Sequence, residues 1–163
     1  MKKNYISLAT RSANIQINEL KKIKKVFNTS FVKAVDQILN CKGKVIFAGI
    51  GKSGLIARKI SATFSSVGIP SFFCDPAQAL HGDMGQIEKK DILIIFSYSG
   101  NTAELNNMLK YANRYRIRII GIASKPDSIL LKASDIKLIL PKVKEADLTG
   151  MVPTSSTSIT LLL

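Results

Sequence analysis

The chain has 163 residues, with 24 Lys and Arg against 11 Asp and Glu, a single His and two Cys. This length suits one compact domain, and its apolar share of 46% is ordinary for a globular protein. Cys41 and Cys74 form no CxxC pair, so they predict neither a zinc site nor a disulfide framework. One His leaves too few residues for a His-rich metal centre or a Ser/His/Asp triad.

The net charge of +13 raises the question of nucleic-acid binding. The lysines are scattered at helical spacing, however, and the sequence has no helix-turn-helix, zinc-finger or RNA-binding aromatic signature. We therefore expect no nucleic-acid partner and a positive surface that steers anionic substrates. The longest apolar runs are too short to cross a bilayer, and residues 1–14 lack the apolar core of a secretory signal. These features predict a cytoplasmic protein with no membrane partner.

The first 40 residues predict helices. Residues 10–28 place apolar side chains at helical spacing, with lysines between them. Residues 31–40 repeat the pattern after Ser30, which we expect to be the N-cap, and the following CKGK stretch ends the helix.

From residue 44 onward, short apolar runs alternate with segments of helical period. The predicted strands are Lys44–Gly49, Ser71–Asp75, Asp91–Ser97, Ile117–Ser124 and Ile136–Leu140. The predicted helices are Ser53–Val67, Thr102–Tyr115 and a short turn at Ser128–Ala133. Continuous apolar strands that alternate with helices are typical of a parallel sheet wrapped by helices, with right-handed crossovers.

Ligands of an open parallel sheet bind where loops leave the carboxyl ends of the strands. The first such loop, Gly49–Gly54, matches GxGxxG and is compatible with dinucleotide binding, with Asp75 as the acid for the ribose. Lys52 argues against this interpretation, because a dinucleotide loop needs no cation in the turn. A Walker A motif would need glycine where Ile46 stands. The alternative is a tight turn that merely requires glycine.

The second loop, Ser97–Thr102 (SYSGNT), combines small hydroxyl side chains with a glycine before a predicted helix. Free backbone N–H groups and hydroxyls in this position suit a phosphate. The alternative is simple helix capping, in which Asn101 is the N-cap and Glu104 completes a capping box.

Two further candidates lie beyond other strands. The loop Pro76–Asp83 holds the only histidine, His81, and Glu145 follows the fifth predicted strand. Each is either a functional group or an ordinary surface residue.

Together, the stretches GKSG, SFFCDPAQALHGDMG, SYSGNTAE and KEADLTGMVPTSSTS resemble the sugar isomerase (SIS) domain family over about residues 40–163. Within that family the sequence is most similar to arabinose-5-phosphate isomerases. The resemblance implies an α/β fold, a three-layer α/β/α sandwich around a five-stranded parallel sheet, and a single domain over residues 1–163. Family members continue further, usually into a pair of CBS domains, whereas Leu161–Leu163 opens an apolar helix that stops early. We therefore expect a domain cut short at its C-terminal end.

The resemblance also implies the site residues. The implied catalytic residues are Lys52, His81, Glu104 and Glu145. The implied phosphate- and substrate-binding residues are Gly51, Ser53, Ser97, Ser99, Gly100, Thr102, Thr154, Ser155, Ser156 and Thr157. A divalent metal near His81 would be inhibitory or incidental, and no cofactor is required. Asn101 stands where family members often carry an acid.

The implied reaction interconverts ribulose 5-phosphate and arabinose 5-phosphate through an enediol and feeds the Kdo branch of lipopolysaccharide synthesis. Glu104 is the first choice for the base, because it lies one turn into the helix that would bind the phosphate, and Glu145 is the second choice. A dimer or tetramer is expected, because SIS sites are usually completed by neighbouring subunits. A non-catalytic sugar-phosphate sensor is the alternative function.

Overall fold

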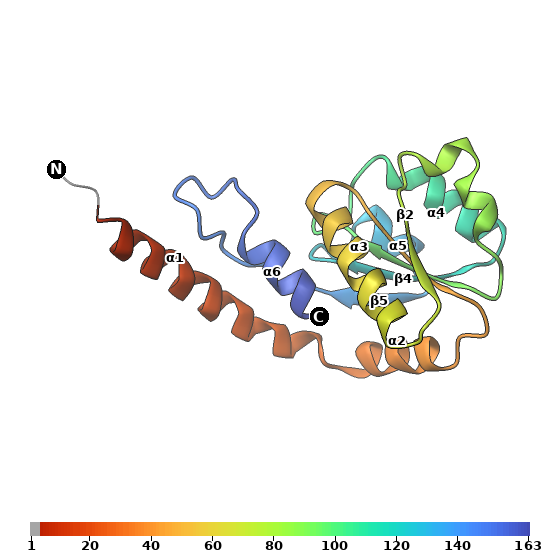
Figure 1. Ribbon diagram of the computed structural model, residues 1–163, viewed down its shortest axis with the longest axis horizontal. Helices are drawn as coiled ribbons and strands as arrows, with labels where there is room; N and C mark the ends of the chain where they lie inside the picture. The colour runs from red at the N-terminus through yellow and green to blue at the C-terminus, as the bar shows by residue number, and fades with distance from the viewer. Residues whose placement is uncertain (1–3) are drawn as a thin grey trace.

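In the computed structural model, which describes residues 4–163, the five apolar runs form one parallel sheet (Figure 1). The strands are β1 (Val45–Gly49), β2 (Ser71–Cys74), β3 (Ile92–Phe96), β4 (Arg118–Ala123) and β5 (Ile136–Ile139). Their order is β2-β1-β3-β4-β5, and every neighbouring pair is parallel. The chain order therefore reverses between β1 and β3, which is where α/β sheets open a ligand crevice at the carboxyl ends of their strands.

Helices cover both faces of the sheet and confirm the three-layer α/β/α prediction. The α-helices are α1 (Tyr5–Leu20), α2 (Thr29–Leu39), α3 (Gly51–Ser66), α4 (Leu105–Arg114), α5 (Ile129–Ala133) and α6 (Ser155–Leu162). The short 3₁₀ turns are η1 (Lys21–Val26), η2 (Ala79–His81) and η3 (Asp83–Gln86). One core joins α4 and α5 to the sheet, and the other joins α2, α3 and α6 to its opposite face.

The burial of the strands explains their composition. Every residue of β1 and β3 is buried, as expected for strands that helices cover on both faces. The edge strand β5 differs, since Ile136 and Leu138 are buried while Lys137 and Ile139 are exposed. The continuous apolar pattern therefore predicted β5 as a strand but overstated how fully it is covered.

The predicted N-cap of α2 is wrong, and the capping box weighed as an alternative before α4 does not form. Asn28, not Ser30, caps α2, and its side-chain oxygen accepts from the backbone N–H groups of Ser30 and Phe31 at 2.8 and 3.4 Å. The alternative interpretation of the SYSGNT loop, a capping box, is not supported, because α4 begins only at Leu105 and its first turn has no side-chain cap. The Asn101 side chain instead accepts from the first N–H of α5 at 3.0 Å.

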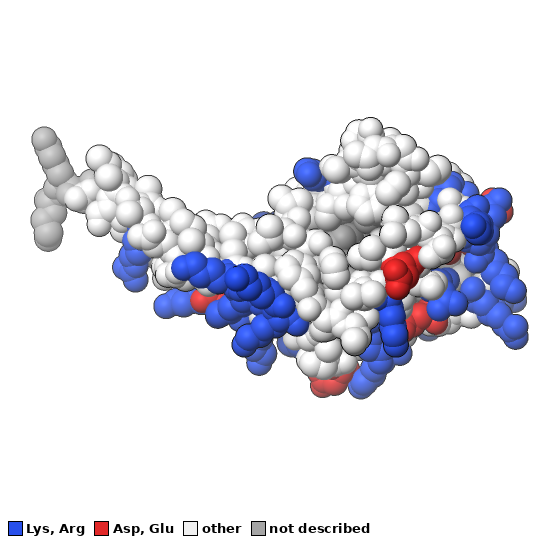
Figure 2. Space-filling model, turned by 90° about the horizontal axis from the view of Figure 1, so that it is seen from below, with Lys and Arg blue, Asp and Glu red and all other residues white. Residues whose placement is uncertain are grey.

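The N-terminal helix α1 extends away from the sandwich and lies along α6 (Figure 1). Gln16 of α1 accepts a hydrogen bond from Ser158 of α6 at 3.0 Å. We call α1 together with η1 the N-terminal arm. Lys and Arg side chains line one side of this arm (Figure 2). Within residues 4–163, no helix is both long and apolar enough to cross a membrane.

Candidate functional site

A cleft of about 380 Å³ opens at the carboxyl edge of the sheet. This volume lies within the range of small-molecule sites. The lining residues come from the ends of β1 and β3, the segment after β5, and α6: Ile50, Lys52, Ser53, Tyr98, Ser99, Glu145, Pro153, Ser156, Thr157 and Thr160. The fold thus brings together six of the predicted site residues, which are Lys52, Ser53, Ser99, Glu145, Ser156 and Thr157.

The N-terminus of α3 forms one side of this cleft. Ile50, at the N-cap position, offers no side chain to the first helical N–H groups. Those groups have no partner within the helix, and they form the positive end of its dipole. Lys52 adds a full positive charge at the same place. This wall of the cleft is therefore suited to an anion.

Glycine is required in this turn for the path of the chain. Gly51 has a φ of +57°, which favours glycine, and a Cβ atom on Gly54 would lie 2.6 Å from the carbonyl oxygen of Gly49. The GxGxxG match is explained by a tight passage from β1 into α3, without reference to a dinucleotide.

The loop Ser97–Thr102 borders the cleft through Tyr98 and Ser99, whereas Ser97, Gly100 and Thr102 are not among the lining residues. The hydroxyls of Ser97 and Thr102 are 2.8 Å apart, and Ser97 also accepts from the N–H of Gly100 at 3.1 Å. Gly100 has a φ of +70° and packs against Ser128. Within the described residues, the backbone N–H groups of Thr102, Ala103 and Glu104 have no hydrogen-bond partner. Ser97 thus shapes the loop from within, Ser99 lines the cleft, and the unpartnered N–H groups lie beside it at the start of α4.

Glu145 faces the first two walls from the segment after β5. One carboxylate oxygen accepts from the Thr154 N–H at 2.7 Å, the Thr154 hydroxyl at 2.9 Å and the Ser156 N–H at 3.3 Å. Burial raises the pKa of Glu145, but the hydrogen bonds from Ser156 and Thr154 outweigh it and hold this pKa below the ordinary glutamate value. Glu145 is therefore ionised near neutral pH and also caps the start of α6.

The residues of the predicted serine-rich turn have different surroundings. Ser156 and Thr157 line the cleft. Thr154 accepts from the Ala146 N–H at 2.7 Å and donates to Glu145, so it holds the acidic segment. Ser155 is fully buried, and its hydroxyl has no hydrogen-bond partner in the part of the chain that the structure describes.

His81 and Glu104 lie outside the cleft lining. His81 ends η2, which contacts α4, and Glu104 directly precedes α4, so both belong to the α4 side of the sheet. Both side chains are exposed. Among residues 4–163, no three His, Cys, Asp or Glu side chains gather as they would around a metal ion. A metal at His81 stays a prediction.

Sequence reasoning missed several residues that line the cleft. Tyr98 stands between the two serines of the SYSG motif, and its position there was the one available signal. Thr160 follows Ser156 by four residues and so lies on the same face of α6. Ile50 and Pro153 add apolar surface that no motif indicated.

Comparison with known proteins identifies the family. Residues 38–163 match the family model described as the SIS domain. The chain belongs to the SIS domain family. This confirms the resemblance that its loops carry, and the five-stranded parallel sheet confirms the expected fold.

Similar SIS proteins include curated enzymes and a solved complex. The chain is 42% identical, over 98% of its length, to "Arabinose 5-phosphate isomerase KdsD" of Francisella tularensis and covers 50% of that protein. It is 40% identical to the protein of the same name in Escherichia coli K12, covering 88% of this chain and 44% of that protein. A solved structure of an E. coli CFT073 protein in complex with arabinose 5-phosphate has a TM-score of 0.93 and 33% identity, covering 99% of this chain and 86% of that chain.

The chain spans about half the length of the curated relatives that it matches. The similarity therefore concerns the part of those proteins that corresponds to the SIS domain and the helices that precede it.

Proposed function

We propose that this chain is a sugar-phosphate isomerase domain that interconverts D-ribulose 5-phosphate and D-arabinose 5-phosphate. The observation that carries this proposal is the meeting of Lys52 and Glu145 with the hydroxyls of Ser53, Ser99 and Ser156 in one cleft of about 380 Å³. The names of the relatives and the arabinose 5-phosphate complex of the similar structure support this choice of substrate.

The phosphate would bind between the N-terminus of α3 and the Ser97–Thr102 loop. Unpartnered backbone N–H groups, a helix dipole and hydroxyl donors form a common phosphate site. Holding the phosphate there would fix the distance of the reacting carbons from Glu145, so binding far from the reaction would orient the substrate at the reacting atoms.

The reaction requires a base and a stabilised oxyanion. A base removes the proton from the carbon next to the carbonyl, the C–H electron pair forms the C=C bond, and the carbonyl oxygen takes up the negative charge of an enediolate. The proton then returns to the neighbouring carbon, while the hydroxyl proton on the oxygen of the deprotonated carbon passes to the enediolate oxygen so that a new carbonyl forms, and no redox cofactor is consumed. Glu145 is ionised and lines the cleft, so it fits the base. Lys52 fits the stabiliser of the enediolate oxygen.

This assignment reverses the order of the two glutamates expected from the sequence, because Glu104 does not line the cleft. Glu104 and His81 keep their predicted roles only if substrate or another subunit reaches them from outside it. We propose a homo-oligomer, a dimer or tetramer, in which a neighbouring subunit completes the site, and a cytoplasmic enzyme whose product enters Kdo and lipopolysaccharide synthesis.

Proton NMR of the chain with ribulose 5-phosphate in deuterated buffer tests the proposal. New arabinose 5-phosphate signals, or solvent deuterium at the carbon next to the carbonyl, would support an isomerase. Broadening of the ligand lines without exchange or product would favour the alternative, a non-catalytic sugar-phosphate-binding domain. If a folded chain showed neither line broadening nor turnover, both the isomerase and the sugar-phosphate-binding function would be contradicted. Glu145→Gln is the informative variant, and Glu88→Gln at an exposed acid is its matched control.

A further inference from the structure

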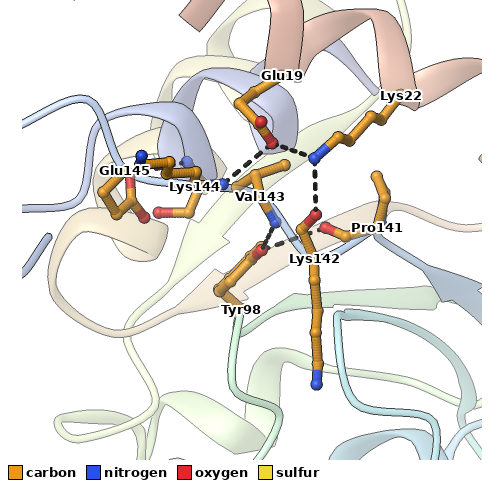
Figure 3. Close-up of polar contacts among 9 residues, drawn as sticks. Glu19, Lys22, Tyr98, Pro141, Lys142, Val143, Lys144 and Glu145 are labelled. Atoms are coloured by element: carbon orange, nitrogen blue, oxygen red, sulfur yellow. Dashed lines mark hydrogen bonds and ion pairs between the residues drawn. The ribbon is translucent and has the colours of Figure 1, made fainter. Parts of the chain in front are cut away.

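Four consecutive residues between β5 and Glu145 are held by side chains from distant parts of the chain (Figure 3). We call Pro141–Lys144 the tether segment. The Tyr98 hydroxyl donates to the carbonyl of Pro141 at 3.1 Å and accepts from the N–H of Val143 at 3.0 Å.

The other two residues of the tether segment turn to the N-terminal arm. Lys22 donates to the carbonyl of Lys142 at 3.5 Å, and Glu19 accepts from the N–H of Lys144 at 3.0 Å. Glu19 and Lys22 also form an ion pair, so the two side chains hold each other in place. These contacts join residues that are 120 and 125 positions apart in the chain.

The alternation of these contacts has a simple geometric cause. In an extended chain, the backbone groups of successive residues point to opposite sides. Residues 141 and 143 therefore face Tyr98, while residues 142 and 144 face the arm formed by α1 and η1. The tether segment resembles a strand whose two neighbours are side chains rather than strands, so its position depends on those side chains.

The backbone of Tyr98 is held as well as its hydroxyl. Its carbonyl accepts from both the N–H and the hydroxyl of Ser124, at 2.8 and 2.7 Å. It lies between Ser97 and Ser99, within the loop to which the proposed function assigns the phosphate. One half-buried side chain therefore connects the phosphate loop to the backbone immediately before Glu145.

We propose that Tyr98 and Glu19 are positioning residues that couple occupancy of the phosphate loop to the placement of the Glu145 carboxylate. This inference rests on the proposed function. Phosphate bound at the loop fixes the backbone position of Tyr98. The Tyr98 hydroxyl, through its hydrogen bond, then fixes the position of Val143. The Glu145 carboxylate, two residues further on, is thereby aligned with the substrate. The arm holds the opposite side of the tether segment, so the constraint moves Glu145 rather than the whole segment.

Amide NMR of the ¹⁵N-labelled chain, titrated with inorganic phosphate, tests the coupling without requiring turnover. In the wild type, the amides of Ser99 and Thr102 report phosphate binding, and those of Thr154 and Ser156, which donate to the carboxylate, shift with the same saturation. In Tyr98→Phe the first pair still shifts, while the shift of the second pair falls by at least half. The direct electrostatic effect of bound phosphate on these amides is the same in the wild type and in Tyr98→Phe. The difference between the two proteins therefore reports the coupling.

The two failures are distinguishable. Silence of the loop amides in the wild type contradicts the proposed phosphate site, and the coupling falls with it. An undiminished shift of the carboxylate-bound amides in Tyr98→Phe overturns the coupling alone and leaves the phosphate site intact.

Kinetics of two variants provide a second test. We expect Tyr98→Phe to lower kcat about 10- to 100-fold and Glu19→Gln about 10-fold, since small misplacements of reacting groups have effects of this size. KM stays within about twofold, because phosphate contacts remain. Tyr115→Phe and Glu88→Gln, at exposed sites, leave both constants unchanged. A kcat within twofold of wild type in both positioning variants, or a rise in KM alone, overturns the inference.

Discussion

Two carboxylates at opposite ends of the strands accept backbone hydrogen bonds, and the difference between them sets a structural carboxylate apart from the proposed catalytic one. Asp91 precedes β3 and is fully buried. One of its oxygens accepts from the Lys44 N–H at 2.7 Å, and the other accepts from the Glu88 N–H at 2.8 Å and pairs with the Lys44 ammonium at 3.3 Å. Both oxygens of Asp91 are therefore occupied.

Glu145 follows β5 and is only half-buried. All of its hydrogen bonds within residues 4–163 reach a single oxygen, Oε2. The second oxygen accepts no hydrogen bond from these residues, and Glu145 lines the cleft. A carboxylate that anchors the backbone with one oxygen and keeps the other for a ligand is suited to proton transfer. Both oxygens of the buried Asp91 already have partners. The comparison teaches that spare acceptor capacity, more than burial or charge, distinguishes the carboxylate that we propose as the base.

Removing the structural carboxylate produces the largest expected loss of stability. Asp91→Ala leaves the backbone N–H groups of Lys44 and Glu88 without their acceptor and removes one of the two carboxylate partners of the Lys44 ammonium, at a cost of roughly 3 to 5 kcal/mol. Urea unfolding followed by circular dichroism measures this loss. Glu88→Gln, which removes an exposed charge, changes stability by less than about 1 kcal/mol. A loss below about 1 kcal/mol for Asp91→Ala would show that the buried cluster is not a structural anchor.

Removing the charge of Glu145 is expected to lower turnover strongly and stability little, in contrast to the removal of Asp91. Glu145→Gln keeps an oxygen that can accept from Thr154 and Ser156, so the fold loses little stability. Turnover falls by about 10²- to 10⁴-fold, the usual contribution of a general base. Steady-state kinetics and a melting curve on the same sample separate the two effects. Normal turnover by this variant would return Glu104 to first place as the base.

The support given to Glu145 by Thr154 has a smaller effect. Thr154→Val removes the hydroxyl that donates to the carboxylate and accepts from the Ala146 N–H. We expect a loss of about 1.5 to 3 kcal/mol, typical of a hydrogen bond to a charged group. Thr154→Ser retains the hydroxyl and restores most of that stability. Equal denaturation midpoints for the Val and Ser variants would contradict this account.

Much of the fold could be predicted from the sequence, because buried parallel strands are continuous apolar runs bounded by polar residues. The five predicted strands agree with the observed ones to within about a residue at each end. The caps were predicted less well. Asn101 is bound by Ile129, which is 28 residues away, and no local pattern shows that contact. Local helix rules assigned it to the nearest helix instead.

The candidate site divides in the same way. Lys52, Ser99 and Glu145 could be brought together in advance, because loops at the carboxyl ends of parallel strands share one edge. His81 and Glu104 follow strands as well, yet they lie on the α4 side, and loop order alone does not reveal this. The contacts of Glu19 and Tyr98 with the tether segment were not predictable, since these partners are 43 to 125 residues away.

The pH dependence of the unfolding free energy is the smallest expected effect. It compares the protonation of Glu145 in the folded chain with that in the unfolded chain. The folded chain holds the pKa of Glu145 below the ordinary glutamate value of 4.5, despite burial, because Ser156 and Thr154 donate to the carboxylate. Around and below that value the unfolded chain binds the proton more readily, so the unfolding free energy rises with pH there. This contribution is complete above the unfolded pKa and is lost as pH falls through the folded pKa. Urea unfolding from pH 3 to pH 6, roughly the range in which carboxyls titrate, measures the slope. Glu145→Gln flattens it, and an equal slope in the two proteins would mean that other carboxylates account for the acid sensitivity.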